Sequence, residues 1–480
     1  MPTRNLPAIL LLLTLSAACG SSAADPAPVE RVFLLSCDTL RADRLGMYGY
    51  GPDVSPNLDA LAAESTVFDE AYACAPMTQP AVSSLMSGRF PTEIGVTPGN
   101  RSLMPPQIET LAEAISANGI ETAAVVSNYL LRKNQRQPKS GVAQGFDHFD
   151  DAMPDREATR GLKERTARHT TDAAISWLES YVERGAGRCF LWVHYQDPHG
   201  PYTPPEEHKQ QFDRPAGAQR VEIGKSRFGH RVIPDYQHIE GSNQPEMYRA
   251  RYDAEIHFFD EQLGRLVDWL DERSLLENSL LIFTADHGEA LGEHDFWFCH
   301  GESLHREIVR IPFFVRAPDG FPLPAAGADG ETRLAVSHLD VFPTVIDALG
   351  LAPVAGLRGE SLLRSTWTEP RIVTQLLLPS PEKRPKWVAA SDGQYRLIWN
   401  DIDNAKRLYD MRTDPGEEHD LAQEHPQRVE ALWEAAKEAM TPRDPLTGQP
   451  AELSAEEYEA MKALGYFAGD DEEAEQKDGK

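Results

Sequence analysis

The feature that most constrains this chain is a pair of short apolar runs, far apart in the sequence, that each lead into an aspartate. Residues 31–36 precede Asp38, and residues 279–283 precede Asp286 and His287. Runs of this length predict buried parallel strands, which would place these side chains at the carboxyl ends of strands. Ligands bind at that edge of open α/β sheets, and clustered carboxylate and imidazole groups there can hold a divalent cation. A lone Asp-His pair is more often an ion pair or a loop cap, so other parts of the chain must support this interpretation.

Further apolar runs alternate with amphipathic stretches, which predicts an α/β fold with a mostly parallel sheet sandwiched by helices. The additional strands are expected at 122–126, 189–193 and 312–315, and the helices at 56–65, 78–87, 107–118, 162–184, 248–276 and 340–349. In the helix at 78–87, Thr78 is a candidate N-cap and Pro80 lies in the first turn. The polar, proline-rich segment 203–248 has no clear period, which is typical of a substrate-facing insertion.

A different pattern follows an expected linker at residues 356–367. Short strands are expected at 386–390, 395–399 and 406–409, and a helix at 427–440 follows them. This pattern predicts a smaller C-terminal α+β subdomain with an antiparallel sheet, which spans residues 368–467. A short helix is expected at 454–464, and the acidic low-complexity segment 469–480 is expected to be disordered.

The charge of the chain limits its partners. Of the 480 residues, 75 are acidic and 47 are basic, which gives a formal charge of −28. This excess argues against nucleic acid or an anionic membrane surface as a partner. An anionic substrate would need positive charge concentrated at its site, and a metal ion supplies such charge. No stretch after the first 20 residues is apolar for long enough to predict a membrane-spanning helix.

Residues 1–24 have the pattern of a secretory signal, with Arg4, an apolar run at 9–15 and then small residues. Cys19 lies at the boundary and resembles the lipidated cysteine of bacterial lipoproteins, although Ser16 stands where that motif has leucine. Two alternatives stay open. Lipidation of Cys19 would anchor the protein in the periplasm or at the outer membrane of a bacterium, whereas ordinary signal cleavage would give a secreted protein. Either alternative predicts export, and a membrane is a partner only through the lipid anchor.

The four remaining cysteines are Cys37, Cys74, Cys189 and Cys299. They are scattered and lack the C-x-x-C spacing that is typical of metal sites. Because Cys37 and Cys299 both adjoin candidate site residues, the sequence leaves open a disulfide between them.

Several motifs together resemble the sulfatase family of the alkaline phosphatase superfamily. They are, in chain order, Asp38 to Asp43, Ser55 to Leu58, His194 to Tyr202, Thr284 to Glu289, His338 to Thr344 and Leu408 to Glu417. The resemblance is collinear from about residue 30 to 466. It implies an alkaline phosphatase-like fold with a catalytic domain over residues 30–355 and the C-terminal subdomain packed against it. It also implies a hydrolase of sulfuric esters.

The nucleophile segment departs from the family pattern. Family sulfatases have C-x-P-x-R, whose cysteine or serine becomes formylglycine, followed by a Leu-Leu-Thr-Gly sequence. Aligning Leu85 to Gly88 with that ending places Thr78 at the nucleophile, Pro80 at the proline and Val82 at the arginine. A competing C-x-P begins at Cys74, but it lies four residues too early for the helix. Threonine cannot become formylglycine, whereas a metal-bound threonine hydroxyl can attack phosphate or phosphonate esters.

The resemblance assigns the remaining roles residue by residue. Asp38, Thr78, Asp286 and His287 would surround one divalent metal ion, and this mixed oxygen and nitrogen set would accept Ca, Mn or Zn. Asn100 resembles a residue that hydrogen-bonds the anionic ester, although a turn residue explains it equally well. His199 and His300 resemble residues that bind the substrate and protonate the leaving group. His194 and His338 are candidates for structural roles.

The resulting hypothesis is an exported, metal-dependent hydrolase of sulfate esters or related phosphate and phosphonate esters, with Thr78 as nucleophile. Its substrate would be a small-molecule or glycan ester, and nucleic acid is not an expected partner. The alternative is a sulfatase-like binding protein with little or no hydrolytic activity.

Overall fold

The structure is a computed structural model of the 480-residue chain. It describes residues 26–455 and 458, except 52, 97–101, 158–160, 216, 225–229, 240–241, 326–331, 333, 365–370, 379–385 and 443–447. The expected signal at 1–24 with Cys19, the candidate Asn100 and the acidic tail 469–480 lie outside the described residues. Most of the helix expected at 454–464 lies outside them as well.

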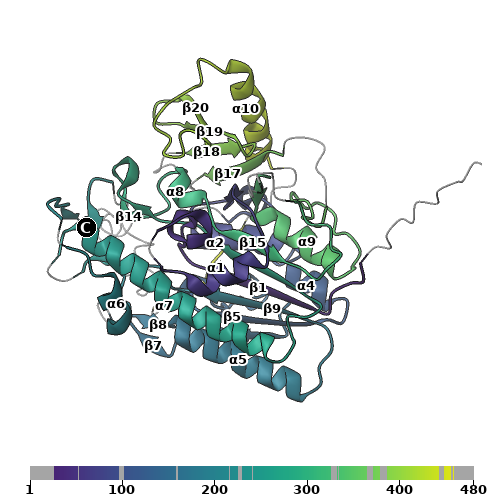
Figure 1. Cartoon of the computed structure of the whole chain (residues 1–480). Coiled ribbons are helices and arrows are strands. Elements are labelled where there is room, and N and C mark those ends of the chain that lie inside the picture. The colour runs from purple at the N-terminus through teal and green to yellow at the C-terminus, as the bar shows by residue number, and fades with distance from the viewer. Residues whose placement is uncertain are drawn as a thin grey trace, which may run out of the picture.

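A seven-stranded sheet forms the centre of the molecule, and its strand order is β2-β15-β12-β1-β9-β5-β6 (Figure 1). The strands are β1 (Arg31–Cys37), β2 (Thr66–Val67), β5 (Glu121–Val126), β6 (His148–Asp150), β9 (Cys189–Tyr195), β12 (Ser279–Ala285) and β15 (Phe313–Arg316). All neighbours from β12 to β6 pair in parallel, whereas β15 pairs antiparallel with both β12 and β2. The mostly parallel sheet predicted from the sequence is therefore confirmed.

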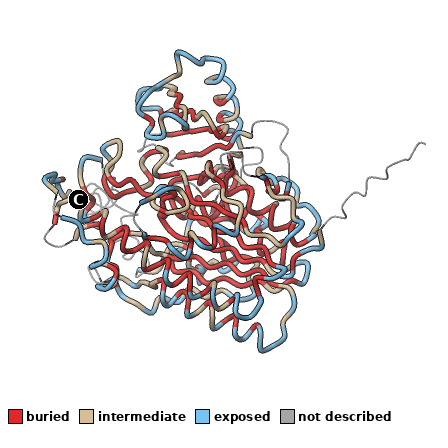
Figure 2. The backbone as a smooth tube through the Cα atoms, in the orientation of Figure 1, coloured by how far each residue is buried: buried red, intermediate tan, exposed pale blue. Residues whose placement is uncertain are grey.

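The central strands are apolar along their whole length because helices cover the sheet. Every residue of β9 and β12 is buried, and so is every residue of β1 after Arg31 (Figure 2). One helical layer contains α1 (Pro56–Ala63), α5 (Ala167–Glu183), α6 (Glu206–Phe212) and α7 (Pro245–Asp271). The other contains α2 (Thr78–Ser87), α4 (Leu111–Ser116) and α9 (Val341–Ala348). This is the layered α/β architecture expected from the alternating apolar runs.

Two helices begin later than the sequence indicated. The helix expected at 162–184 starts at Ala167, because β8 (Lys163–Glu164) pairs with β7 (Asp155–Arg156) in a short hairpin. The helix expected at 107–118 starts after Thr110, whose hydroxyl accepts a hydrogen bond from the Glu113 backbone N–H at 3.1 Å. This is a capping box, which fixes where α4 begins.

Short elements connect these layers. They are β3 (Ala71–Tyr72), α3 (Pro91–Ile94), β4 (Ser102–Leu103), β10 (Ile223–Gly224), β11 (Ile233–Pro234), β13 (Ala290–Leu291), β14 (Trp297–Cys299), α8 (Arg306–Val309), β16 (Val336–Ser337) and β21 (Gln449–Pro450). None of the described helices is long and apolar enough to cross a membrane.

The C-terminal subdomain is a four-stranded antiparallel sheet covered by one helix (Figure 1). Its elements are β17 (Val373–Leu377), β18 (Trp387–Ser391), β19 (Tyr395–Asn400), β20 (Lys406–Asp410) and α10 (Pro426–Met440). Three of the strands match the sequence prediction, and β17 is an additional edge strand that the sequence analysis did not identify. A buried ion pair between Arg396 and Glu417 lies beneath this sheet, and Arg396 also donates to the Leu304 carbonyl of the main domain.

The described cysteines Cys37, Cys74, Cys189 and Cys299 are all buried free thiols. The disulfide left open between Cys37 and Cys299 is therefore not formed. The two side chains lie in different apolar clusters, since Cys37 packs in the main core and Cys299 packs with the residues under the C-terminal sheet.

Candidate active site

Strand register brings the two aspartates together. Strands β1 and β12 pair in parallel until Cys37 faces Ala285, so Asp38 and Asp286 follow side by side at the carboxyl edge of the sheet. The Asp286 backbone N–H donates to the Cys37 carbonyl at 3.0 Å. Both carboxylates are almost completely buried. The position predicted from the two apolar runs is thus the one that the structure shows.

Four polar atoms converge at this edge. His287 Nε2 lies 3.8 Å from Asp38 Oδ1, 3.5 Å from Asp286 Oδ2 and 3.4 Å from Thr78 Oγ1. Asp38 Oδ1 and Asp286 Oδ2 are buried without any hydrogen-bond partner. Unpaired buried carboxylate oxygens are costly unless a cation balances them. These four residues therefore fit a divalent metal ion, which they would hold between two carboxylates, one imidazole and one hydroxyl.

The other atoms of the same side chains are held by the protein. Asp286 Oδ1 accepts hydrogen bonds from the backbone N–H groups of Thr39 at 3.1 Å and His287 at 2.7 Å. Asp38 Oδ2 accepts from the Asn128 amide. His287 Nδ1 lies 2.9 Å from the Gly288 carbonyl, which makes Nδ1 the protonated nitrogen and leaves the lone pair of Nε2 for a ligand bond. Such outer contacts orient metal ligands.

The pKa values agree with a site built around a cation. Burial, with repulsion from Asp286, raises the pKa of Asp38 well above its ordinary value. Burial likewise raises the pKa of Asp286 to about 7. Burial and the nearby His300 lower the pKa of His287 well below its ordinary value, so this imidazole is neutral and can act as a ligand. A divalent cation would offset the cost of the two buried negative charges.

Thr78 is the first residue of α2, and Met77 is its N-cap. The expectation that Thr78 caps this helix is therefore wrong, because its hydroxyl is directed to the metal-site residues. The competing Cys74 is buried against the C-terminal sheet, in an apolar cluster that contains none of those residues. Burial raises the pKa of its thiol, so it is not an activated nucleophile. The structure brings Thr78, and not Cys74, to Asp38, Asp286 and His287.

Both candidate acid histidines lie beside the metal-site residues. The His300 ring is 4.5 Å from the His287 ring and 5.3 Å from the His199 ring, centroid to centroid. His199 Nδ1 is 2.7 Å from the Gly200 carbonyl, and His300 Nδ1 is 3.1 Å from Glu289 Oε1. In each ring the protein holds the Nδ1 atom, which fixes the orientation of the ring.

His194 and His338 each bind a core group through one ring nitrogen. His194 Nδ1 contacts the Ser36 hydroxyl at 2.9 Å, and His338 Nε2 contacts the Ala285 carbonyl at 2.8 Å. Burial lowers the pKa of His194 to about 3 and that of His338 to about 4. Both are thus neutral core histidines, in agreement with the structural role considered for them.

Two residues of the site had no role assigned from the sequence. Asn128 lies two residues after β5 and donates to Asp38, and Glu289 is the last residue of the Thr284 to Glu289 motif and contacts His300. Tyr202 donates to the other oxygen of Glu289 at 3.2 Å. The sequence contains one indication for Asn128, which is its position just after a buried strand. Because the carboxyl ends of parallel strands meet at the same edge of the sheet, this position places Asn128 near Asp38.

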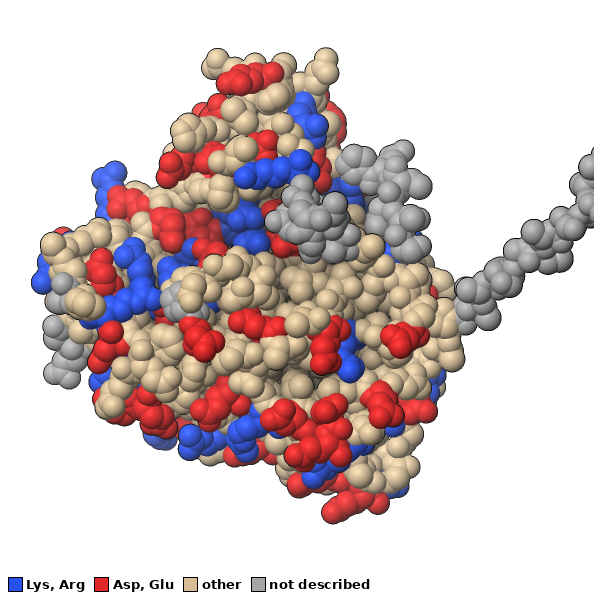
Figure 3. Space-filling view, viewed as in Figure 1, with Lys and Arg blue, Asp and Glu red and all other residues tan. Residues whose placement is uncertain are grey.

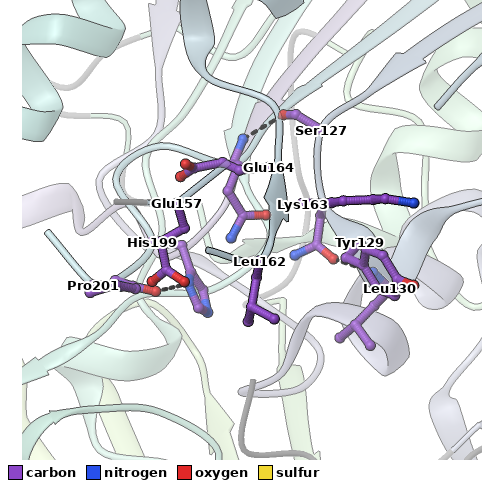
Figure 4. Close-up of a pocket in the computed structure, with 12 residues that line it drawn as sticks. Ser127, Tyr129, Leu130, Glu157, Leu162, Lys163, Glu164, His199 and Pro201 are labelled. Carbon is purple, nitrogen blue, oxygen red and sulfur yellow. Dashed lines mark hydrogen bonds between the residues drawn. The ribbon is translucent and has the colours of Figure 1, made fainter. Parts of the chain in front are cut away.

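A cavity of about 40 Å³ adjoins the site between the β7–β8 hairpin and His199 (Figure 4). Its walls include Asn128 and His199 from the strand ends and Lys163 and Glu164 from the hairpin. A group bound at the metal residues would therefore face the hairpin on this side.

Replacing Asn128 with alanine is expected to weaken metal binding by about 10-fold to 100-fold, because Asp38 Oδ2 loses the donor that orients the carboxylate. Titration of the metal-free protein with Mn²⁺ measures this affinity. Asn118, a surface asparagine whose amide donates to the Ala114 carbonyl, provides the matched control Asn118→Ala. Equal affinities for both variants would contradict the orienting role.

Comparisons with known proteins place this geometry in context. A family model described as Sulfatase matches residues 30–351. The chain is 25% identical over 425 residues to the protein named uncharacterized sulfatase YidJ of Escherichia coli (strain K12), and the match covers 80% of this chain and 81% of that protein. It resembles a solved structure in complex with its substrate D-glucosamine-2-N,6-O-disulfate, with a TM-score of 0.67, 20% identity, and 86% and 98% of the two chains covered. It also resembles the phosphonate monoester hydrolase of Agrobacterium radiobacter, with a TM-score of 0.67, 22% identity, and 86% and 95% covered.

Proposed function

The chain belongs to the sulfatase family, and we propose that it is a metal-dependent hydrolase of sulfate esters or of related phosphate and phosphonate esters, with Thr78 as its nucleophile. The observation that carries this proposal is the position of the Thr78 hydroxyl. It lies 3.4 Å from His287 Nε2, at the first turn of α2 and beside two unpartnered carboxylate oxygens. A hydroxyl in this position can lose its proton and attack a bound ester as a nucleophile.

Asp38, Asp286 and His287 would hold the divalent ion together with Thr78. When bound, such an ion lowers the pKa of a coordinated hydroxyl and balances negative charge on the ester oxygens. The α2 N-terminus adds a partial positive charge at the same place. Thr78 Oγ1 then forms a bond to sulfur or phosphorus, and the bond from that atom to the leaving oxygen breaks with its electron pair on the oxygen.

His300 and His199 would complete this step by giving a proton to the leaving oxygen. The contact between His300 Nδ1 and Glu289 Oε1 orients the His300 ring, and Nε2 would be the atom that meets the leaving oxygen. In the second step, water attacks phosphorus or sulfur and Thr78 leaves as the free hydroxyl.

The threonine favours phosphorus over sulfur. A formylglycine hydrate releases sulfate by elimination across its second hydroxyl, and a threonine ester has no second hydroxyl. Water must therefore attack the transferred group directly, which is ordinary for phosphoryl esters in this superfamily. The phosphonate monoester hydrolase among the similar structures supports this choice, whereas the relatives named as sulfatases support sulfate esters. The leaving group would be a small alcohol, a phenol or a sugar.

Four esters with one common aryl leaving group test the proposal: a sulfate ester, a phosphate monoester, a phosphodiester and a phosphonate ester. We expect kcat/KM for the phosphonate or a phosphate ester to exceed that for the sulfate by roughly tenfold or more, which is about 1.4 kcal/mol of activation free energy. A sulfate ester as much the best substrate would defeat the argument from threonine. Lack of turnover on all four esters by metal-loaded protein would favour the alternative, a binding protein with the same fold.

We also propose that the protein acts outside the cytoplasm. The support is the pattern of residues 1–24, with Cys19 as the candidate lipid-bearing residue.

A further inference from the structure

A second cluster of metal-ligand side chains lies where the C-terminal subdomain meets the main domain. His294 follows β13, His305 precedes α8, and Glu417 comes from the loop after β20. One ligand atom from each of the three residues lies within 4.8 Å of the others. His305 Nδ1 is 2.8 Å from Glu417 Oε2, and the two imidazole rings are stacked with centroids 3.6 Å apart and planes 9° apart. The cluster shares no residue with the candidate active site.

Glu307 gives an independent indication that a cation binds here. Its side chain is 8% exposed, and its Oε2 lies 3.9 Å from His294 Nε2. Its Oε1 is buried without a hydrogen-bond partner. A buried carboxylate oxygen without a partner is costly, and a bound cation would remove that cost.

Three arginines of this region pair with carboxylates other than Glu307. Arg306 pairs with Glu70 at 2.7 Å, and Arg41 pairs with Asp43 at 2.6 Å and with Glu293 at 2.9 Å. Arg396 pairs with Oε1 of Glu417, so the oxygen of Glu417 that faces His305 is Oε2. Glu307 belongs to none of these ion pairs, and its Oε2 lies beside the His294 imidazole. Imidazole nitrogen and carboxylate oxygen together suit a borderline metal ion.

His294 and Glu307 line a cavity of about 470 Å³, together with Pro415, Gly416 and Glu418 of the C-terminal subdomain. Figure 1 places α8 directly below the β17–β18 edge of the subdomain sheet, and acidic and basic side chains both gather at this junction in Figure 3. An ion in this cavity would therefore lie beside His294 and Glu307.

We propose that His294, His305 and Glu417 form a second cation site, which binds a divalent ion of the Zn²⁺ class with Glu307 as a further carboxylate ligand. Zinc takes such imidazole and carboxylate ligands at about 2.0–2.2 Å, which requires ligand atoms about 3.0–3.5 Å apart. His305 Nδ1 and Glu417 Oε2 already lie 2.8 Å apart, and binding would require the His294 ring, whose side chain is 23% exposed, to turn out of its stack on His305. Because Glu417 belongs to the C-terminal subdomain, the ion would tie that subdomain to the main domain.

Zinc stoichiometry tests this site separately from catalysis. In the Asp286→Asn background, which weakens the candidate active site, equilibrium dialysis and elemental analysis give the remaining zinc per chain. We expect His294→Ala and His305→Ala to lower that zinc by about one ion per chain in this background. We also expect zinc to raise the Tm of the Asp286→Asn protein but not of either double variant. Neither readout depends on ester hydrolysis, so a failure of the proposed function leaves this test intact.

Two further variants keep the test decisive. Glu307→Gln has the same shape as the native residue and is expected to weaken zinc binding at least tenfold while the protein stays folded. His419→Ala removes a histidine that is 78% exposed in the same subdomain, and it should leave the zinc content unchanged. Equal zinc in the Asp286→Asn protein and in its His294→Ala and Glu307→Gln derivatives would overturn the proposal.

Discussion

Thr78→Ala is expected to lower kcat/KM roughly 10⁴-fold to 10⁶-fold on the best ester, the loss seen when an enzyme loses its nucleophile. The reason is geometric. Thr78 Oγ1 lies 3.4 Å from His287 Nε2, whereas Cys74 packs in the apolar cluster against the C-terminal sheet. Thr78→Ser keeps the hydroxyl and should retain activity within about tenfold. Cys74→Ala should retain most of the activity, with a loss of about 1 kcal/mol of stability from the small cavity it leaves.

Each variant is measured by steady-state kinetics, thermal unfolding and metal content. Ser84→Ala is the matched control for Thr78→Ala, because it removes a buried hydroxyl without a hydrogen-bond partner from the same helix. Thr78→Ala should also keep its metal, since Asp38, Asp286 and His287 remain. The opposite pattern, with an inactive Cys74→Ala and an active Thr78→Ala, would show that the nucleophile segment is aligned wrongly.

The central sheet could be predicted because its strands are buried on both faces. Such strands are short apolar runs in the sequence, and β1, β9 and β12 all match the expected runs within two residues. Edge elements were harder to predict. Strand β17 and the β7–β8 hairpin have mixed composition, and they form only because a neighbouring strand is in place.

The convergence of the candidate metal-site residues could be predicted, because each follows a central strand or starts a helix at one edge of the sheet. The parallel register of β1 and β12 is enough to predict that Asp38 and Asp286 lie side by side. Asn128 and Glu289 could not be assigned in the same way, because their roles depend on side-chain directions at the ends of loops. Glu417 illustrates a further limit: its proximity to His294 and His305 depends on how the C-terminal subdomain docks, and no local pattern encodes that.

Removing the divalent ion is expected to abolish turnover and to reveal a contribution of Asp286 to folding stability that falls as pH rises. Burial raises the pKa of Asp286 from 3.8 to about 7 in the protein without metal, and the pKa of Asp38 shifts in the same direction. Between these values the folded protein binds more protons than the unfolded chain. The contribution of Asp286 to the free energy of unfolding is therefore fully present below about pH 4. It is lost as pH rises through about 7, and its size is on the order of 4 kcal/mol.

Metal binding should reverse this dependence, because the ion binds the ionised carboxylates and its affinity rises with pH until they are deprotonated. His287 acts in the opposite direction. Burial keeps its ring neutral in the folded protein, whereas the unfolded chain takes up a proton on it below a pKa of about 6.5, so this contribution to stability rises with pH. The Asp286 contribution is therefore measured as a difference between the metal-free wild type and metal-free Asp286→Asn, by thermal unfolding from about pH 5 to 8. We expect the Tm of the wild type to fall relative to that of Asp286→Asn as pH rises, and the same pH dependence in both proteins would contradict the proposed pairing of two buried carboxylates around a cation. Reloading the wild type with Ca²⁺, Mn²⁺ or Zn²⁺ identifies the ion that restores turnover.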